Sequence, residues 1–421
     1  MGLTLDPRPA SPDEVAQVEA AQRLVRWSLA LAFAAVPLQQ LIILPVVGPL
    51  TDLLVPIAVL GAVIGLLRGA PMRRPPVTLG FLLAFVGWTG ATYFWSIAPG
   101  QTAARFLTYL QLLALATVVL LLVRTRADRS FVIQGYVLGS SLVVLRTLAN
   151  FVQGNQANTS TEYLRFAAGE ANPNRTAAAL LIAMACAWYL LVRSRRLRAF
   201  NLGVILATPL ALLLTASRSA FVAGAVFGAL VLIWSMRTGR SGRAGVLFVV
   251  GAAVLVALAL VPDSALDRIT AVGGGAEVAQ GSVDLRSNAI DRGLEAFWVA
   301  PVHGSGAGTF AERTAESGSK GVVAHNSYLS VATELGLVGF VLFAGAALSA
   351  VWQLRRADEV DRWFGILLLV VWALIAAFAS FEDDKLTWLA LMLLATTPPA
   401  SVLVATTPGV AGGTAPGRDG P

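Results

Sequence analysis

One of the two histidines of the chain, His325, directly precedes a long apolar segment in the stretch VVAHNSYLSVATELGLVGFVLF. Asn326 or Ser327 can cap a helix that begins there, because their side chains accept hydrogen bonds from its first N–H groups. The partial positive charge of a helix N-terminus favours a neutral imidazole, and only the neutral ring can act as a general base. A structural histidine that caps the helix or meets lipid headgroups is the alternative, and the residues alone leave both interpretations open.

A second group of candidate functional residues consists of arginines at positions where a charge costs free energy. Arg146 lies inside an apolar segment, Arg175 opens another in ANPNRTAAALL, and Arg218 lies in LLLTASRSAFVAG, where two apolar segments meet with almost no loop. A charge inside a membrane span costs on the order of 3 kcal/mol on insertion scales. A headgroup or a carboxylate could compensate any one of them. Several arginines on one face favour a polyanionic ligand, because each guanidinium can donate two parallel hydrogen bonds to a phosphate.

The elements that carry these residues are predicted to be membrane helices. The 421-residue chain is 56% hydrophobic and 13% charged, whereas a soluble domain carries about 25% charge. Its hydropathy predicts about twelve spans, each long enough to cross a hydrocarbon core of about 30 Å. The spans lie near residues 24–46, 50–67, 77–97, 104–123, 130–152, 174–192, 199–216, 219–236, 244–262, 328–353, 363–380 and 386–405.

The net charge of +7 does not indicate a nucleic-acid partner, because the arginines gather in short clusters between apolar segments. The clusters fall at every second loop, which is typical of cytoplasmic loops. They are RGAPMRR (68–74), RTRADR (124–129), RSRRLR (193–198), RTGRSGR (237–243) and RRADEVDR (355–362). The opposite side is predicted to carry Arg105, Arg146, Arg165, Arg175, Arg218, Arg268, Arg286, Arg292 and Arg313.

This phasing predicts an all-α polytopic integral membrane protein with both termini in the cytoplasm. The predicted parts are a cytoplasmic N-terminal tail (1–23), transmembrane helices 1–9 (24–262), an extracytoplasmic loop (263–324), transmembrane helices 10–12 (325–405) and a disordered cytoplasmic tail (406–421).

The long outer loop is predicted to contain a helix and a glycine turn. The stretch SVDLRSNAIDRGLEAFWVA is amphipathic and predicts a helix along the membrane surface. Its apolar face would contain Leu285, Ile290, Leu294, Phe297 and Trp298. The glycines of PVHGSGAGTF resemble a phosphate-cradling loop, but no strand precedes them and no lysine follows. A tight turn is therefore the favoured interpretation, and His303 within it receives no role.

Four segments, in this order, resemble the O-antigen ligase and polysaccharide polymerase family of bacterial membrane glycosyltransferases. ANPNRTAAA is similar to an Asn-Pro-Asn segment that opens a middle span, and TASRSAFVAG resembles a Ser-Arg motif between two spans. DLRSNAIDRGLEAFWVAPVHGSGAGTF resembles the signature of the outer loop, and HNSYLSVATELGLVGF resembles a His-Asn-x-Tyr-Leu motif followed by Glu-Leu-Gly. The resemblance covers roughly residues 170–345 by motif, and the rest by span count.

The resemblance implies a GT-C-like fold in the cytoplasmic (inner) membrane. It implies transfer of a glycan from an undecaprenyl-diphosphate carrier to a glycan or lipid-linked glycan acceptor, with the active site on the extracytoplasmic side and no metal or nucleotide cofactor. Members of the family act as ligases or polymerases in the biosynthesis of lipopolysaccharide and other polysaccharides. On this interpretation His325 is the catalytic base, Arg175, Arg218 and Arg286 bind the donor diphosphate, and Asn326 and Tyr328 orient the base or bind sugar.

The carboxylates of the outer side favour the same chemistry. No Asp-x-Asp stands in the predicted outer loops, and the dense cluster FEDDK (381–385) is interpreted as an acidic cap rather than a metal site. Arginines would then stabilise the leaving diphosphate, and direct attack by the acceptor hydroxyl would invert the anomeric carbon. A flippase for lipid-linked glycans and a polytopic anion transporter are the alternatives. Both would use the spans and the arginines, but neither needs a base.

Overall fold

The computed structural model describes residues 11–39, 41–45, 48–157, 164–169, 172–238, 251, 277–315 and 321–400. This part of the chain is helical except for loops and one short antiparallel hairpin, β1 (Ile43–Leu44) with β2 (Gly48–Pro49). Its α-helices are α1 (Pro12–Ala35), α2 (Leu50–Leu67), α3 (Val77–Ala91), α4 (Pro99–Leu122), α5 (Arg126–Val152), α6 (Pro173–Arg193), α7 (Arg198–Leu214), α8 (Arg218–Arg237), α11 (Glu277–Val299), α12 (Phe310–Arg313), α13 (Ser327–Trp352), α14 (Glu359–Phe378) and α15 (Lys385–Ala395). Short 3-10 helices follow α1, α3 and α13, namely η1 (Val36–Leu38), η2 (Thr92–Trp95) and η3 (Gln353–Arg356).

Eight helices of the described chain are long and apolar enough to cross a membrane, namely α2, α3, α4, α5, α6, α8, α13 and α14. The helices α7 and α15 are apolar but shorter. The chain is therefore a mostly helical, multi-pass membrane protein. The predicted span at 244–262 (apart from residue 251), the segment 263–276 and the tail at 406–421 lie outside the described residues, so the count of about twelve stays a prediction.

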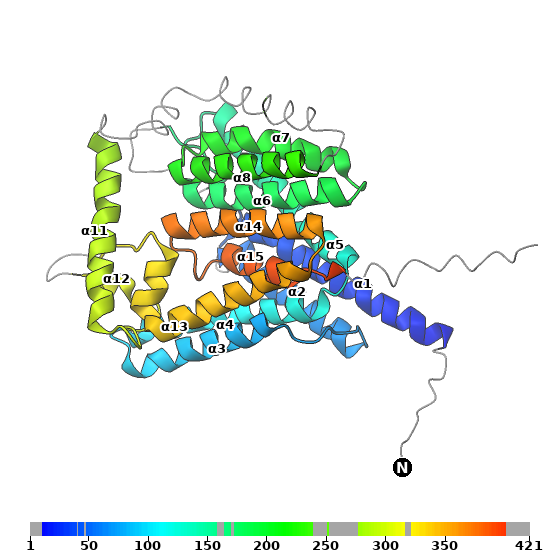
Figure 1. Ribbon diagram of the computed structural model, residues 1–421, viewed down its shortest axis with the longest axis horizontal. Coiled ribbons are helices and arrows are strands. Elements are labelled where there is room, and N and C mark those ends of the chain that lie inside the picture. The colour runs from blue at the N-terminus through cyan, green and yellow to red at the C-terminus, as the bar shows by residue number, and fades with distance from the viewer. Residues whose placement is uncertain are drawn as a thin grey trace, which may run out of the picture.

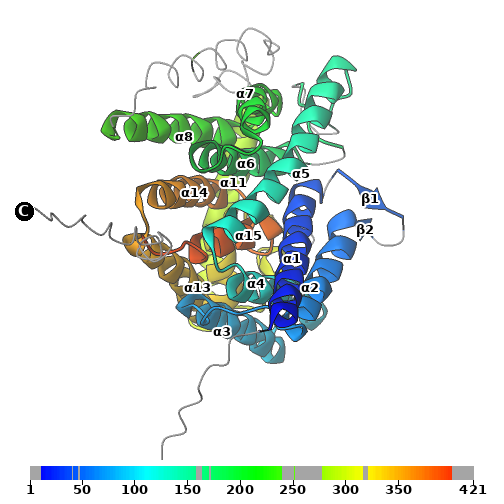
Figure 2. The same ribbon diagram turned by 90° about the vertical axis from the view of Figure 1, so that its right-hand side faces the viewer.

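The long helices lie side by side, and one helix crosses their ends. Figure 1 shows α6, α7, α8 and α14 as a stack of roughly parallel rods, with α13, α3 and α4 on the other side of α15. The yellow-green helix α11 runs across the left-hand ends of these rods (Figure 1). Seen from the side in Figure 2, α1, α2 and α5 form a third group beside them. The end of the bundle that α11 crosses is the end that carries the candidate site.

Close approach of α1 and α5 depends on two glycines. A Cβ atom on Gly135 would lie 2.4 Å from the carbonyl oxygen of Ala30, and one on Gly139 would lie 2.0 Å from that of Ala34. Real side chains cannot enter such spaces, so the two backbones touch only because these positions are glycine. Small residues at helix contacts are the common means of close packing between membrane helices.

Several charged residues inside the bundle form ion pairs. Arg129 on α5 is fully buried, and its guanidinium lies 2.5 Å from the carboxylate of Asp361 on α14. Arg126 of α5 and Arg193 of α6 also pair with Asp361 and with Asp358, which caps α14. The network fastens α5, α6 and α14 together. It compensates charges that would each be costly without a partner.

The ends of some helices differ from the predicted spans. The first helix begins at Pro12 rather than near residue 24, because Ser11 and Glu14 form a capping box around its first turn. Hydropathy detects only the apolar part of a helix, whereas the capping box sets its start. At the other end of the chain, α15 stops at Ala395 after 11 residues, and the chain beyond residue 400 lies outside the described part.

The helix α11 packs against α13 through its small residues. Ala289 and Ala296 are buried, and a Cβ on Gly293 would lie 2.6 Å from the side chain of Leu329 on α13. The Thr333 hydroxyl of α13 donates a 3.1 Å hydrogen bond to the Gly293 carbonyl. The apolar side chains Ile290, Leu294 and Trp298 are exposed. Amphipathicity predicted the helix, but the contact with α13 selects the smallest side chains because they allow the closest approach.

Candidate active site

His325 stands at the start of α13 in an uncommon backbone conformation. Its φ angle is +47°, in the left-handed region that non-glycine residues rarely adopt. The next residue, Asn326, caps α13, because its side-chain oxygen accepts hydrogen bonds from the N–H groups of Tyr328 (2.9 Å) and Leu329 (3.1 Å). The cap fixes where the helix begins, so it also fixes the position from which the His325 side chain projects.

Arg286 interacts with both His325 and Arg218, although the three residues come from separate segments. Partial burial lowers the pKa of His325, and the charge of Arg286 on α11 lowers it further. Partial burial also lowers the pKa of Arg286, and the next cause is the charge of Arg218, the first residue of α8. The structure therefore brings together three of the residues that the sequence selected. A lowered pKa leaves the imidazole neutral at neutral pH, which a general base requires.

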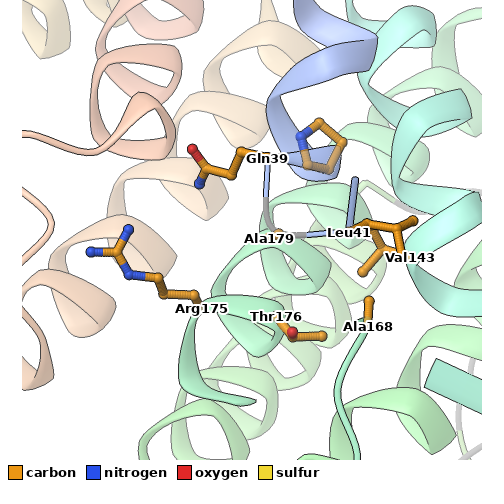
Figure 3. A pocket seen from close by; sticks show the side chains of 8 residues that line it. Gln39, Leu41, Val143, Ala168, Arg175, Thr176 and Ala179 are labelled. Atoms are coloured by element: carbon orange, nitrogen blue, oxygen red, sulfur yellow. The ribbon is translucent and has the colours of Figure 1, made fainter. Parts of the chain in front are cut away.

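The third predicted arginine, Arg175, has different partners. Its guanidinium lies 2.5 Å from the carboxylate of Asp384 and 5.3 Å from the centre of the Phe381 ring. The amide of Gln39 donates to the same carboxylate. Arg175 and Gln39 border a small pocket whose lining is otherwise mostly apolar (Figure 3). Arg175 thus has its contacts at the loop before α15, whereas Arg218 and Arg286 interact with each other.

The position of Arg218 depends on a buried arginine that the sequence did not single out for a role. Arg165 donates to the carbonyl of Thr215, just before α8, and to the side chain of Asn174 in the first turn of α6. Its side chain is buried. Arg165 therefore joins the Asn-Pro-Asn segment to the Ser-Arg segment. The sequence signal was present, since Arg165 is one of the arginines on the predicted outer side.

The glycine turn after α11 fills a break in α13. Gly336 has a φ of +65°, which interrupts the helix and leaves backbone groups without helical partners. The N–H groups of Leu337 and Val338 donate to the carbonyls of Pro301 and Val302, 2.8 and 3.3 Å away. In return, the N–H groups of Ser305 and Gly306 donate to carbonyls on the other side of the break. Backbone N–H and carbonyl groups of the turn and of the broken helix therefore hydrogen-bond to each other.

A buried carboxylate completes this contact. Glu334, on α13 just before the break, accepts hydrogen bonds from the N–H groups of Gly308 (2.7 Å) and Phe310 (3.2 Å). The N–H groups between Gly304 and Phe310 all have partners within the protein. They are not available to cradle a phosphate, so the turn interpretation holds. No role for Glu334 could be inferred from the sequence, because its partners are backbone groups.

Two other residues considered from the sequence have packing roles. The ring of His303 lies 5.7 Å from that of Trp95, and its Nδ1 atom is 2.8 Å from the Gly304 carbonyl oxygen. The hydroxyl of Tyr328 donates to the carbonyl of Ala373 on α14, 3.2 Å away. Tyr328 therefore points its polar end toward α14, and His303 belongs to the contact between the glycine turn and η2.

The acidic cluster after α14 is divided among several partners. Asp383 pairs with Arg105 on α4, Asp384 pairs with Arg175, and Glu382 accepts a hydrogen bond from Ser330 on α13. Within the described ranges no group of three or more His, Cys, Asp or Glu side chains is placed to hold a metal ion. The cluster ties the loop between α14 and α15 to three neighbouring helices.

The fold and this site define a class of protein, a multi-pass membrane protein with a histidine and arginines gathered at one end of its helix bundle. Residues 202–344 match the family model described as O-antigen ligase. This region, 143 of the 421 residues, is similar to the O-antigen ligase family, which supports a membrane glycosyltransferase of the ligase or polymerase type. The matched region includes Arg218, Arg286 and His325, whereas Arg175 precedes it. No curated protein sequence matches the chain.

Proposed function

We propose that the chain transfers a glycan from an undecaprenyl-diphosphate carrier to a sugar hydroxyl at the extracytoplasmic face of the cytoplasmic membrane. The observation that carries this proposal is that Arg286 interacts both with Arg218 and with a histidine of lowered pKa. These residues come from segments far apart in the sequence, and all three lie in the region that matches the family. A cation pair beside a neutral base suits a reaction that releases a phosphate and removes a proton.

The arginines stabilise the leaving group. As the bond between the anomeric carbon and the diphosphate oxygen breaks, its electron pair stays on that oxygen and negative charge grows there. Arg218 and Arg286 meet this charge as fixed cations, which need no reorganisation during the reaction. Arg175 belongs to the same clamp, with its guanidinium held by Asp384 so that its remaining N–H groups can reach the diphosphate. The arginines replace a divalent cation, so the reaction needs no metal.

His325 activates the acceptor. Its neutral imidazole takes the proton of the acceptor hydroxyl while the hydroxyl oxygen bonds to the anomeric carbon. The attack comes from the side opposite the diphosphate and therefore inverts the configuration of that carbon. Asn326 supports the base through the cap that fixes the start of α13. Tyr328 supports it through its contact with α14.

The test compares the two histidines. With purified protein, EDTA and a lipid-linked donor, His325→Ala is expected to lower the transfer rate by roughly 10²–10⁴-fold, the range for a general base. Donor binding is expected to remain, because the arginines are intact. His303→Ala is the matched control and is expected to retain transfer. A near-normal transfer rate in His325→Ala would show that His325 is not the general base. Movement of the lipid-linked glycan across vesicles without transfer would support a flippase instead.

A further inference from the structure

Glu382 is a buried acid at the contact between the loop 379–384 and the start of α13. Its exposed fraction is 2%. The hydroxyl of Ser330, in the first turn of α13, donates a 2.6 Å hydrogen bond to its Oε1 atom. Within the described part of the chain no hydrogen-bond donor reaches its Oε2 atom. The backbone N–H of Glu382 itself also interacts with the carboxylate, but neutral hydrogen bonds without a counter-ion are too little to stabilise a buried carboxylate ion.

Among the described residues, the charged groups around Glu382 form no ion pair with it. Asp383 in the same loop and Glu334 on α13 are both acids, and Tyr109 on α4 carries no positive charge. Arg105 on α4 is the cation among these neighbours, and it pairs with Asp383. Burial, followed by the charges of Asp383 and Glu334, raises the pKa of Glu382 to about 8. Glu382 is therefore a neutral carboxylic acid at neutral pH.

The same loop holds the residues next to His325. The hydroxyl of Ser327 donates to the carbonyl of Ala379 (2.9 Å) and accepts from the N–H of Phe381 (2.7 Å). The bond from Ser330 to Glu382 is the third link between the loop and the first turn of α13. His325 lies two residues before Ser327, so these links fix the helix end from which its side chain projects.

We infer that Glu382, in its neutral form, is a positioning residue that holds the start of α13, and with it His325, in the arrangement for transfer. Ionisation of Glu382 adds a further negative charge to those of Asp383 and Glu334. That repulsion separates the loop from α13 and displaces His325. The inference rests on the proposed function, because it acts through the base assigned there.

The first experiment is a pH profile of transfer. Ionisation of Glu382 is expected to lower the transfer rate above about pH 8. Glu382→Gln is neutral at every pH and keeps an oxygen for Ser330, so it is expected to transfer at pH 7 and to lose the alkaline decline. Glu382→Ala removes the acceptor for Ser330 and is expected to reduce transfer at every pH. The exposed acid Glu312, changed to Gln, is the matched control and should keep the native profile.

The second experiment measures the accessibility of His325 independently of the transfer reaction. In a His303→Ala background His325 is the one histidine left in the chain, so its modification by diethyl pyrocarbonate can be followed by mass spectrometry on protein with a histidine-free tag. With Glu382 present, modification is expected to rise about twofold or more above pH 8, because His325 becomes more exposed. With Glu382→Gln it is expected to stay level.

The outcomes separate the two proposals. Equal pH profiles and equal modification rates for native Glu382 and Glu382→Gln would overturn the positioning role while leaving the transferase intact. Absence of transfer with lipid-linked donors would overturn the proposed function, and the modification rates would still decide the role of Glu382. If the Glu382→Gln variant loses the fall in transfer rate above pH 8 and its His325 modification rate stays constant with pH, both the transferase function and the positioning role are supported.

Discussion

The lowered pKa of His325 has two physical causes that can be separated by mutation. Protein atoms replace part of the water around the ring, and Arg286 opposes a second positive charge nearby. From the sequence, the helix N-terminus alone was expected to keep the ring neutral. In the structure, the charge of Arg286 is a second cause of the lowered pKa. Arg286 lies on α11, far from His325 in the sequence. Arg286 therefore acts on the base as well as on the proposed donor.

The pH dependence of transfer tests this interaction. A base with a lowered pKa is protonated only in more acidic solution, so the acidic limb of kcat/KM against pH should lie below the ordinary histidine range. Arg286→Gln removes the opposing charge and should move the midpoint of that limb to higher pH. Arg286→Lys keeps the charge and should leave the midpoint near its native value, even if transfer is slower. A midpoint that is the same in Arg286→Gln and the native protein would show that Arg286 does not act on His325.

Arg218 is expected to contribute to donor binding and to rate. Arg218→Ala should cost about 2–4 kcal/mol of transition-state stabilisation, as for the loss of one donor to a developing charge. Arg218→Lys should recover only part of this, because an ammonium group cannot form two parallel hydrogen bonds to phosphate. The measurements are kcat/KM and donor affinity. Arg237→Ala, at the other end of α8, is the control, and an equal loss in that variant would indicate a general effect on the helix.

The site residues that could be predicted are those whose residue type is unusual at their position in the sequence. A charge beside an apolar segment is costly, so Arg218 and Arg175 could be selected from the sequence. Glu334 and Glu382 could not be assigned, because an acid near a helix end is ordinary. Their roles come from backbone N–H groups and a serine brought close by the fold. Pairing of Arg175 with Asp384 also depends on residues 209 positions apart.

At the scale of the helices, the break in α13 connects the glycine turn to the start of the site. The same turn follows α11, the helix that carries Arg286, so α11 and α13 are joined at Gly336 as well as along their packed faces. The sequence predicted both helices and the turn. It could not predict their mutual hydrogen bonds, because a glycine within an apolar helix has many ordinary explanations.

Replacement of Gly336 tests this connection. In Gly336→Ala a Cβ would lie 2.3 Å from the Val302 carbonyl oxygen, at a φ of +65°. The variant should have a lower melting temperature and slower transfer, because α11 is displaced. Gly80→Ala in α3 is the matched control, since a Cβ there meets no atom within 4 Å. That change should be neutral or stabilising by up to about 1 kcal/mol, as alanine favours a helix. Equal melting temperatures in the two variants would contradict the role of the break.

At the scale of the whole molecule, the side of the membrane that carries the site can be tested by labelling. In a Cys186→Ser background, single cysteines at the exposed positions Ser287 on α11 and Ala199 on α7 mark opposite predicted sides. An impermeant thiol reagent added to cells with a permeable outer envelope should label position 287 and spare position 199. Labelling of 199 alone would reverse the predicted orientation and place the site in the cytoplasm.

The ion network of Arg129 has a consequence for how the chain is made. Asp361 follows Arg129 by 232 positions, so at about 5–20 residues per second the ribosome needs roughly 12–46 s to supply the partner. During that interval α5 contains an arginine without its carboxylate, and its first turn must remain among headgroups or water. Completion of the bundle therefore waits for α14. Chains that stop before α14 should be recognised by membrane proteases as unfinished, whatever the state of their earlier helices.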